Sequence, residues 1–334
     1  VISGCSYIFL LFYLFQHTII YKRLEEVSDQ IKTFYFSRAR SALKYGLLSL
    51  GFKEGDQLLV PDFICDSIFH TPVDNSYTFK FFEVSDDLKP TWDQMDFLIT
   101  PKVKAILMVH YFGQPQEIDK FLEFSRKHNI LLIEDNAHGH GGLYQGKRLG
   151  TFGHMGISSP RKFINIHGGG ELILKTDCYR TPIPDLPSSE PIKNINSISL
   201  FLDRFPNFKN NLRKTLKKRP LYENPLEFQE NTIKDTCLDQ GTIELIKSTD
   251  WHAVGHSRRE RFLELRKIAV QNGLQPLYDT PASQSNPWCF AAYASNQNEA
   301  SSWFDWGWKN NISVFSWPTL RQEQIEDANN KAYN

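Results

Sequence analysis

Short, almost continuously apolar segments alternate with amphipathic segments between residues 22 and 175, and this alternation constrains the fold more than any other feature. Residues 103–113 (VKAILMVHYFG) and 130–135 (ILLIED) are apolar at nearly every position, as strands buried on both faces are. Between them, residues 117–129 (EIDKFLEFSRKHN) have the periodicity of an amphipathic helix. Strands and helices in this order predict an α/β fold with a mostly parallel, doubly wound sheet.

The pattern changes after about residue 180, where a proline-rich connection begins. Residues 257–273 (SRRERFLELRKIAVQNG) predict a long amphipathic helix that Ser257 caps and Gly273 ends. A short strand at residues 286–294 and a helix, turn and strand at residues 300–320 follow. We therefore expect a large domain at residues 22–240, a smaller α+β domain at residues 241–334, and a separate apolar segment at residues 1–21.

The charge balance and the cysteines exclude two classes of protein. Lys+Arg and Asp+Glu both number 38, so the formal net charge is zero and no basic face for nucleic acid is indicated. The 5 cysteines lie far apart, without a CxxC pair, which argues against a zinc site. We expect no metal, reduced thiols and a cytoplasmic location.

The apolar residues 7–15 (YIFLLFYLF) raise the question of a membrane segment. About 20 apolar residues are needed to span a bilayer, and this run is shorter and is followed by Gln16 and His17. A signal peptide would need a basic start and a small-residue cleavage site, and the sequence has neither. We favour a core or dimer-interface segment and expect no membrane partner.

Polar residues follow several of the expected strands at the point where each strand ends. The run LLIEDNAHGHGG carries Glu134 and Asp135 at its strand end, with His138 and His140 just beyond. Ligands of parallel sheets bind at the carboxyl ends of the strands. The sequence therefore predicts one shared site at this edge of the sheet.

A lysine further along the chain gives this acid pair a chemical partner. In GISSPRKFINIHGGG, Ser158 and Ser159 precede Lys162, and a glycine run follows. Pyridoxal phosphate (PLP) chemistry needs a lysine to form a Schiff base, an acid on the pyridine nitrogen, and hydroxyl and N–H groups for the phosphate. Asp135, Lys162 and the two serines supply these groups, and residues 37–43 (SRARSAL) supply a helix N-terminus.

Four segments of the chain, in order, resemble the DegT/DnrJ/StrS family of fold-type I, PLP-dependent sugar aminotransferases. The resemblance covers residues 35–180 well and the C-terminal part more loosely. We expect three departures from the family. The apolar stretch stands in place of the family's N-terminal substrate segment. The Asn-x-Arg loop is not recognisable between residues 180 and 250, and the sequence is expected to stop at EDANNKAYN before the family's last strand. The segments that carry the resemblance are GFKEGDQLLVPDF, VKAILMVHYFGQPQEID, IEDNAHGHGGLYQGKRLGTFGHMG and the lysine segment.

The resemblance implies a role for individual residues. Lys162 matches the Schiff-base lysine, Asp135 the acid on the pyridine nitrogen, and His138 a contact to the ring hydroxyl. Ser158 is the preferred match for the phosphate serine, and Ser159 stays open. Further matches are Ala39 and Arg40, whose backbone amides would hold the phosphate, and Phe63, preferred over Cys65 as the ring-stacking residue.

The function that the resemblance implies is transfer of an amino group from an amino acid, glutamate above all, to a keto-sugar that carries a nucleotide, by a homodimer. Such reactions belong to polysaccharide or amino-sugar biosynthesis. A PLP-dependent sugar dehydratase is disfavoured because that branch of the family has His in place of the lysine. The alternative from another class is a catalytically idle regulatory or scaffold protein that keeps the fold. A metal site at Asp135, His138 and His140 is disfavoured because it would leave Lys162 without its acid.

Overall fold

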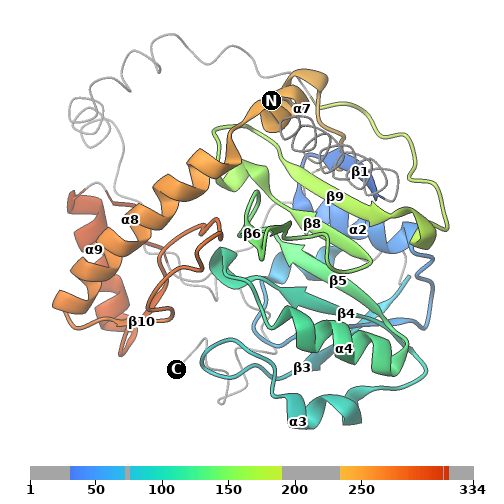
Figure 1. Cartoon of the computed structure of the whole chain (residues 1–334), viewed down its shortest axis with the longest axis horizontal. Helices are drawn as coiled ribbons and strands as arrows, with labels where there is room; N and C mark the ends of the chain where they lie inside the picture. The colour runs from blue at the N-terminus through green and yellow to red at the C-terminus, as the bar shows by residue number, and fades with distance from the viewer. Residues whose placement is uncertain (1–30, 72–75, 190–233, 311, 316–334) are drawn as a thin grey trace, which may run out of the picture.

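The computed structural model describes residues 31–71, 76–189, 234–310 and 312–315, and a seven-stranded sheet forms its centre (Figure 1). Only β9 runs against its neighbours; every other adjacent pair is parallel. This confirms the predicted α/β fold with a mostly parallel sheet. In spatial order the strands are β1 (Ile31–Phe36), β9 (Gly170–Lys175), β8 (Met155–Ser158), β5 (Leu131–Asn136), β4 (Val103–Val109), β2 (Gln57–Pro61) and β3 (Thr78–Phe82).

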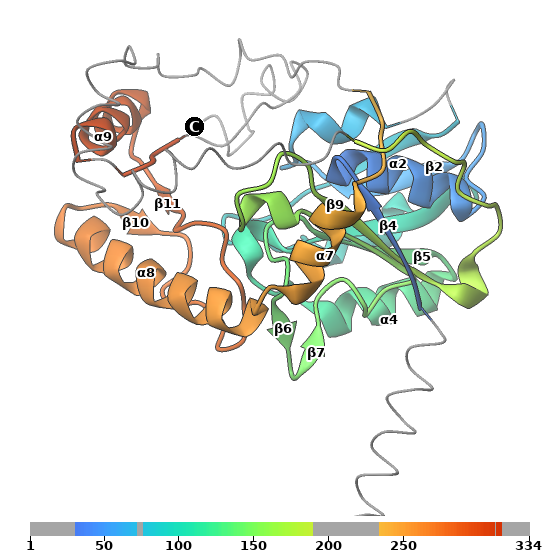
Figure 2. The same cartoon turned by 90° about the horizontal axis from the view of Figure 1, so that it is seen from above.

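Helices cover both faces of the sheet, which is why its central strands are apolar on both sides. The helix α2 (Ala39–Ser49) packs on β1, β8 and β9, and α4 (Ile118–His128) packs on β4 and β5. Figure 2 shows α2 and α4 on opposite sides of the sheet. The short α3 (Trp92–Met95) follows β3 in the chain.

The boundaries of α4 follow from its sequence. Its buried residues Ile118, Phe121 and Phe124 recur at helical spacing and face the sheet. The helix ends at Asn129, which adopts the left-handed conformation with φ 51°. Asparagine tolerates this conformation better than most residues, and the basic residues 126–128 complement the negative end of the helix dipole.

Within its described residues, the C-terminal part contains three helices and a small hairpin beside the sheet. The helices are α7 (Gln240–Ser248), α8 (Trp251–Gln271) and α9 (Gln297–Asn310), and the hairpin pairs β10 (Gln275–Pro276) with β11 (Ala292–Tyr293). Figure 1 shows α8 running from the sheet towards α9.

The predicted start of α8 at Ser257 was wrong. The helix begins at Trp251, where the Asp250 side chain accepts a hydrogen bond from the Ala253 N–H at 2.9 Å. Aspartate satisfies an N–H group of the first turn that has no partner within the helix. Ser257 lies within the helix, because the cap at Asp250 stands upstream of it.

A second hairpin, β6 (Leu143–Tyr144) with β7 (Lys147–Arg148), follows the strand β5.

Among the described residues, no helix is long and apolar enough to cross a membrane. The apolar segment predicted at residues 1–21 lies outside the described residues. The predicted domain boundary at residues 240 and 241 falls at the start of α7 and stays a prediction.

Candidate active site at the carboxyl edge of the sheet

A cavity of about 110 Å³ lies where β1, β2, β4, β5 and β8 end. The six parallel strands point their carboxyl ends to this edge, as doubly wound sheets do at their ligand sites. The predicted residues that line the cavity are Ala39, Arg40, Asp135, His138, Ser159 and Lys162. Ser158 and Phe63 do not line it.

Lys162 ends the 3-10 turn η4 (Pro160–Lys162), which follows β8 directly. Burial lowers the pKa of its amine to about 8, and the charge of Asp135 opposes part of that effect. The Nζ atom lies 4.2 Å from the ring centroid of Trp288. An amine with such a pKa is neutral in an appreciable fraction near neutral pH and can act as a nucleophile.

Asp135 faces the same cavity from the end of β5. Burial raises the pKa of its carboxyl, whereas the Ala137 N–H, bonded to Oδ1 at 2.9 Å, and the charges of Lys162 and His110 lower it. Positive charge nearby therefore helps to keep this carboxylate ionised. A protonated ring nitrogen placed in the cavity would supply such a charge.

Glu134, the other member of the acid pair, points away from the cavity because successive residues of a strand face opposite sides. Its carboxylate accepts hydrogen bonds from the Gly150 N–H at 2.8 Å and the Gly153 N–H at 2.6 Å. His110 lies 3.2 Å away through Nε2, and its Nδ1 accepts from the Gln116 N–H at 3.1 Å, so Nε2 carries the hydrogen. Glu134 thus holds the glycine-rich loop in place.

His138 is buried between two aromatic rings at the edge of the cavity. Its ring centroid lies 4.5 Å from that of Trp288 and 5.9 Å from that of Phe112. The Phe112 N–H donates to Nδ1 at 3.3 Å. Burial, with a smaller effect of Lys162, lowers the pKa of His138 well below its usual value. The imidazole is therefore neutral with its hydrogen on Nε2, a donor suited to an oxygen acceptor.

The two adjacent serines point to different surroundings, which settles where each hydroxyl lies. Ser159 lines the cavity, and its Oγ donates to the Gly169 carbonyl at 3.2 Å. Ser158 turns its hydroxyl to the other side and donates to Glu171 Oε2 at 2.9 Å. The geometry therefore favours Ser159 as the hydroxyl available to a ligand.

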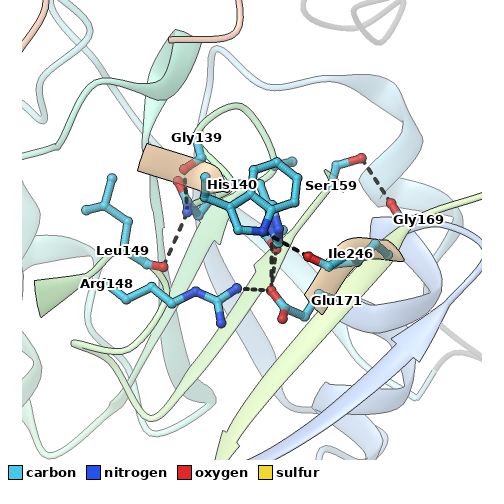
Figure 3. A network of polar contacts seen from close by, with 12 residues as sticks. Gly139, His140, Arg148, Leu149, Ser159, Gly169, Glu171 and Ile246 are labelled. Atoms are coloured by element: carbon cyan, nitrogen blue, oxygen red, sulfur yellow. Dashed lines mark hydrogen bonds and ion pairs between the residues drawn. The ribbon is translucent and has the colours of Figure 1, made fainter. Parts of the chain in front are cut away.

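Ser158 belongs to a polar network with His140, Glu171 and Arg148. Figure 3 shows the last three of these residues. His140 Nδ1 lies 2.7 Å from Ser158 Oγ and donates to it, because the hydroxyl hydrogen goes to Glu171. Burial alone would raise the pKa of the Glu171 carboxyl. The Arg148 guanidinium, with the hydrogen bonds from His140 and Ser158, outweighs burial and lowers that pKa to about 2.

The N-terminus of α2 forms one wall of the cavity through Ala39 and Arg40. No acidic side chain occupies the first turn of this helix, so the positive end of its dipole can attract an anion. Arg38, the residue before the helix, also lines the cavity and donates to the carbonyls of Ser37 and His167, both at 2.9 Å. With Ser159 beside it, this end of the cavity fits a phosphate group.

Phe63 lies near the site without lining it. Its ring centroid is 5.8 Å from that of Tyr111, whose hydroxyl donates to the Phe63 carbonyl at 2.6 Å. The neighbouring Ile64 and Cys65 line the cavity instead. Cys65, the alternative that the sequence left open, is therefore the nearer candidate for contact with a planar ring.

Sequence reasoning missed the contribution of the C-terminal part. Trp288 supplies the aromatic face against Lys162 and His138. The backbone N–H of Trp288 donates to the Phe112 carbonyl at 3.0 Å. Arg258 of α8 donates to the Lys162 carbonyl at 3.2 Å. Nothing in the local sequence pattern marks either residue, because their partners lie far away in the chain. The described residues contain no cluster of three or more His, Cys, Asp or Glu that could hold a metal ion.

Comparisons with known proteins agree with this architecture. GDP-perosamine synthase of Caulobacter vibrioides is 34% identical over 145 residues, which are 41% of this chain and 38% of that protein. The chain thus spans well under half the length of the curated relatives that it matches first, at 38% for two of them.

Two solved structures share the fold at low sequence identity. DesV of S. venezuelae, in complex with a ketimine intermediate, has a TM-score of 0.57 at 19% identity, with 89% of this chain and 73% of that one covered. A DegT DnrJ EryC1 StrS aminotransferase from Brucella abortus has a TM-score of 0.56 at 17% identity, with 92% and 77% covered. Residues 28–181, which contain the sheet and the cavity, match the model of the DegT/DnrJ/EryC1/StrS aminotransferase family. The match to this family model covers less than half of the chain.

Proposed function

We propose that this protein is a PLP-dependent aminotransferase that moves an amino group from an amino acid, glutamate above all, to a keto-sugar linked to a nucleotide. The observation that carries the proposal is the pairing of Lys162 and Asp135 across one cavity, with each shifting the pKa of the other. The name of the relative from Caulobacter vibrioides supports the choice of a nucleotide-linked sugar.

The residues around the cavity fit the parts of PLP. The phosphate would lie at the N-terminus of α2, held by the N–H groups of Ala39 and Arg40, the Arg38 side chain and the Ser159 hydroxyl. Asp135 would accept a hydrogen bond from the ring nitrogen and keep it protonated. The neutral His138 would donate from Nε2 to the ring hydroxyl.

When bound, PLP supplies an aldehyde for amines and a protonated ring that takes up negative charge. Lys162 would supply the amine for that aldehyde and a base at Nζ for the proton on the donor's Cα. Its pKa of about 8 suits both roles, because the neutral amine is accessible near neutral pH. Asp135 stabilises the positive ring nitrogen throughout.

The remaining parts of the proposal concern the partners. Arg161, exposed at the rim of the cavity, is a candidate contact for the diphosphate of the acceptor sugar. The other candidate from the sequence, the basic segment at residues 214–219, lies outside the described residues. The homodimer and the cytoplasmic location stay predictions.

The test is the absorbance spectrum of the purified protein with PLP, before and after L-glutamate. We expect the long-wavelength band of lysine-bound PLP, its loss on addition of glutamate, and no band in Lys162→Ala. Borohydride reduction followed by peptide mass spectrometry should place the cofactor on the peptide that contains Lys162. Lys175→Ala, which changes a lysine of β9 outside the cavity, serves as the matched control.

A band that survives Lys162→Ala would contradict the assignment of the lysine. A band that needs Lys162 but is indifferent to every amino-acid donor would instead favour an idle protein that keeps the cofactor. Transfer to a keto-sugar is then measured directly by the return of the band on addition of the acceptor.

A further inference from the structure

The guanidinium group of Arg258 joins the turn that carries Lys162, here called the lysine turn, to the C-terminal segment around Trp288. Arg258 of α8 donates through Nη2 to the carbonyls of Lys162 at 3.2 Å and Phe163 at 3.4 Å. Through Nη1 it donates to the carbonyls of Pro287 at 3.4 Å and Trp288 at 2.9 Å. Four backbone acceptors from two segments, which are distant in sequence from each other and from α8, thus meet at one side chain.

The chemistry of this contact requires arginine. Lys162 is the last residue of η4, and carbonyls at the end of a helical turn lack partners within that turn. The described residues offer the Lys162 and Phe163 carbonyls no backbone N–H donor. A planar guanidinium has five N–H donors in a fixed fork and can serve both segments at once, whereas an ammonium group is a point donor. The Phe163 ring lies 4.6 Å below the guanidinium and holds its plane.

The same two segments also meet through their side chains. Lys162 Nζ lies over the Trp288 ring, so Lys162 and Trp288 are joined at the backbone by Arg258 and at the side chains by this contact. The position of the amine therefore depends on the C-terminal segment as well as on β8. The neighbouring Cys289 does not attract the Lys162 amine as an anion, because burial raises the pKa of its thiol to about 12 and keeps it neutral.

We propose that Arg258 is a positioning residue that holds the Lys162 turn against Trp288 and thereby sets the location and burial of the Lys162 amine. Its part in the reaction rests on the proposed function, but the contact itself does not. Without this clamp, the turn is free to move into solvent, and the amine loses the burial that favours its neutral form.

The experiment measures the pH dependence of Lys162 acetylation by N-hydroxysuccinimidyl acetate in the cofactor-free protein, read by peptide mass spectrometry. In wild type the midpoint should lie near the pKa of about 8. Arg258→Lys should raise it by about one pH unit or more, because a point donor cannot hold both segments.

Arg259→Lys is the matched control. This adjacent residue of α8 donates to the Ser285 carbonyl at 2.6 Å and so contacts the same C-terminal segment, but no contact joins it to the lysine turn among the described residues. Its acetylation midpoint should stay at the wild-type value. An unchanged midpoint in Arg258→Lys, or an equal shift in both variants, would overturn the proposal.

If Arg258→Lys does not fold, Phe163→Leu tests the same idea by removing the ring that supports the guanidinium. It should raise the midpoint in the same direction by a smaller amount, and no rise would count against the proposal. The readout needs no cofactor. A shift in Arg258→Lys in a protein that never bonds PLP would therefore keep Arg258 as the positioning residue while rejecting the aminotransferase assignment.

Discussion

Glu134 and Asp135 are adjacent residues with the same chemistry and different tasks. Asp135 faces the cavity and Lys162, whereas Glu134 faces the protein interior and binds the N–H groups of Gly150 and Gly153. The alternation of a strand is the cause, since it turns successive side chains to opposite sides. Ser158 and Ser159, at the end of β8, likewise turn their hydroxyls to different surroundings.

We expect Lys162 to destabilise the cofactor-free protein. Its folded pKa of about 8 lies below the usual 10.5, so folding disfavours the charged amine at every pH below about 8. The stability of wild type should rise between pH 8 and 10.5, where the folded state has released the proton and the unfolded state retains it. Lys162→Met should therefore be more stable by on the order of 1 kcal/mol at pH 7, with a gain that shrinks at alkaline pH.

Urea unfolding of cofactor-free protein at several pH values measures this effect. Lys175→Met reports what the substitution does away from the cavity. A Lys162→Met variant that is less stable than wild type at pH 7 would contradict the view that burial of this amine is unfavourable.

The two serines can be separated by one pair of variants. Ser159→Ala should weaken PLP binding by about tenfold or more, because it removes a hydrogen bond to a charged phosphate, with little change in stability. Ser158→Ala should lower the free energy of unfolding by about 1–3 kcal/mol, since it breaks the buried bonds to His140 and Glu171, with a smaller effect on affinity. Fluorescence titration with PLP and urea unfolding measure the two quantities; the reverse pattern would assign the phosphate to Ser158.

At the scale of elements, the N-terminus of α2 reaches the cavity because β9 approaches it closely. Gly170, the first residue of β9, allows this contact: a Cβ at that position would overlap the backbone of Arg38 and Ala39. The glycine run after Lys162 therefore has a packing role at its last member. It brings the helix N-terminus up to the end of the sheet.

Gly170→Ala should push α2 away from β9. We expect a loss of about 1–3 kcal/mol in unfolding free energy from overpacking, together with weaker PLP binding. Gly241→Ala, in the exposed first turn of α7, is the control and should be neutral or stabilising by up to about 1 kcal/mol through helix propensity. Equal affinities for PLP in Gly170→Ala and wild type would show that the helix N-terminus does not bind the phosphate.

At the scale of the whole molecule, polar and aromatic contacts join the sheet to the C-terminal helices. The rings of His140 and Trp251 are nearly perpendicular with centroids 4.3 Å apart, and the Trp251 indole N–H donates to the Ile246 carbonyl at 3.0 Å. Glu171 of β9 is linked to His140 through the Ser158 hydroxyl. The buried carboxylate thus connects β9 with the junction of α7 and α8.

Glu171→Gln should lower the free energy of unfolding by about 2 kcal/mol or more at pH 7, because it removes the charge that Arg148 pairs with in a buried site. The folded pKa of about 2 lies below the usual 4.5, so the carboxylate stabilises above pH 4.5 and this contribution is lost as pH falls towards 2. In the variant, that part of the acid dependence should be absent. Glu264→Gln on the exposed face of α8 should change stability by no more than about 0.5 kcal/mol, and an equal loss in both variants would contradict the role of Glu171.

Much of the large domain could be predicted from the sequence because its signals are local. Continuous apolar runs and amphipathic helices specify which segments become strands and helices, and strand ends specify where polar side chains collect. The prediction failed where several local signals competed. Ser257 looked like a helix start, yet Asp250 caps α8 earlier, since both residue types can satisfy the free N–H groups of a first turn.

The sequence by itself determined the class of fold and indicated that Lys162 and Asp135 share one site. The alternation of strands and helices and the spacing of motifs, on which these predictions rest, are written along the chain. Only the tertiary structure decided which serine faces the cavity and which residue of the C-terminal part reaches the lysine. Arg258 lies 96 positions from Lys162, and their contact exists because α8 and the segment around Trp288 pack against the end of the sheet. Such contacts depend on the angle and depth at which elements pack, and no periodicity in the sequence encodes these.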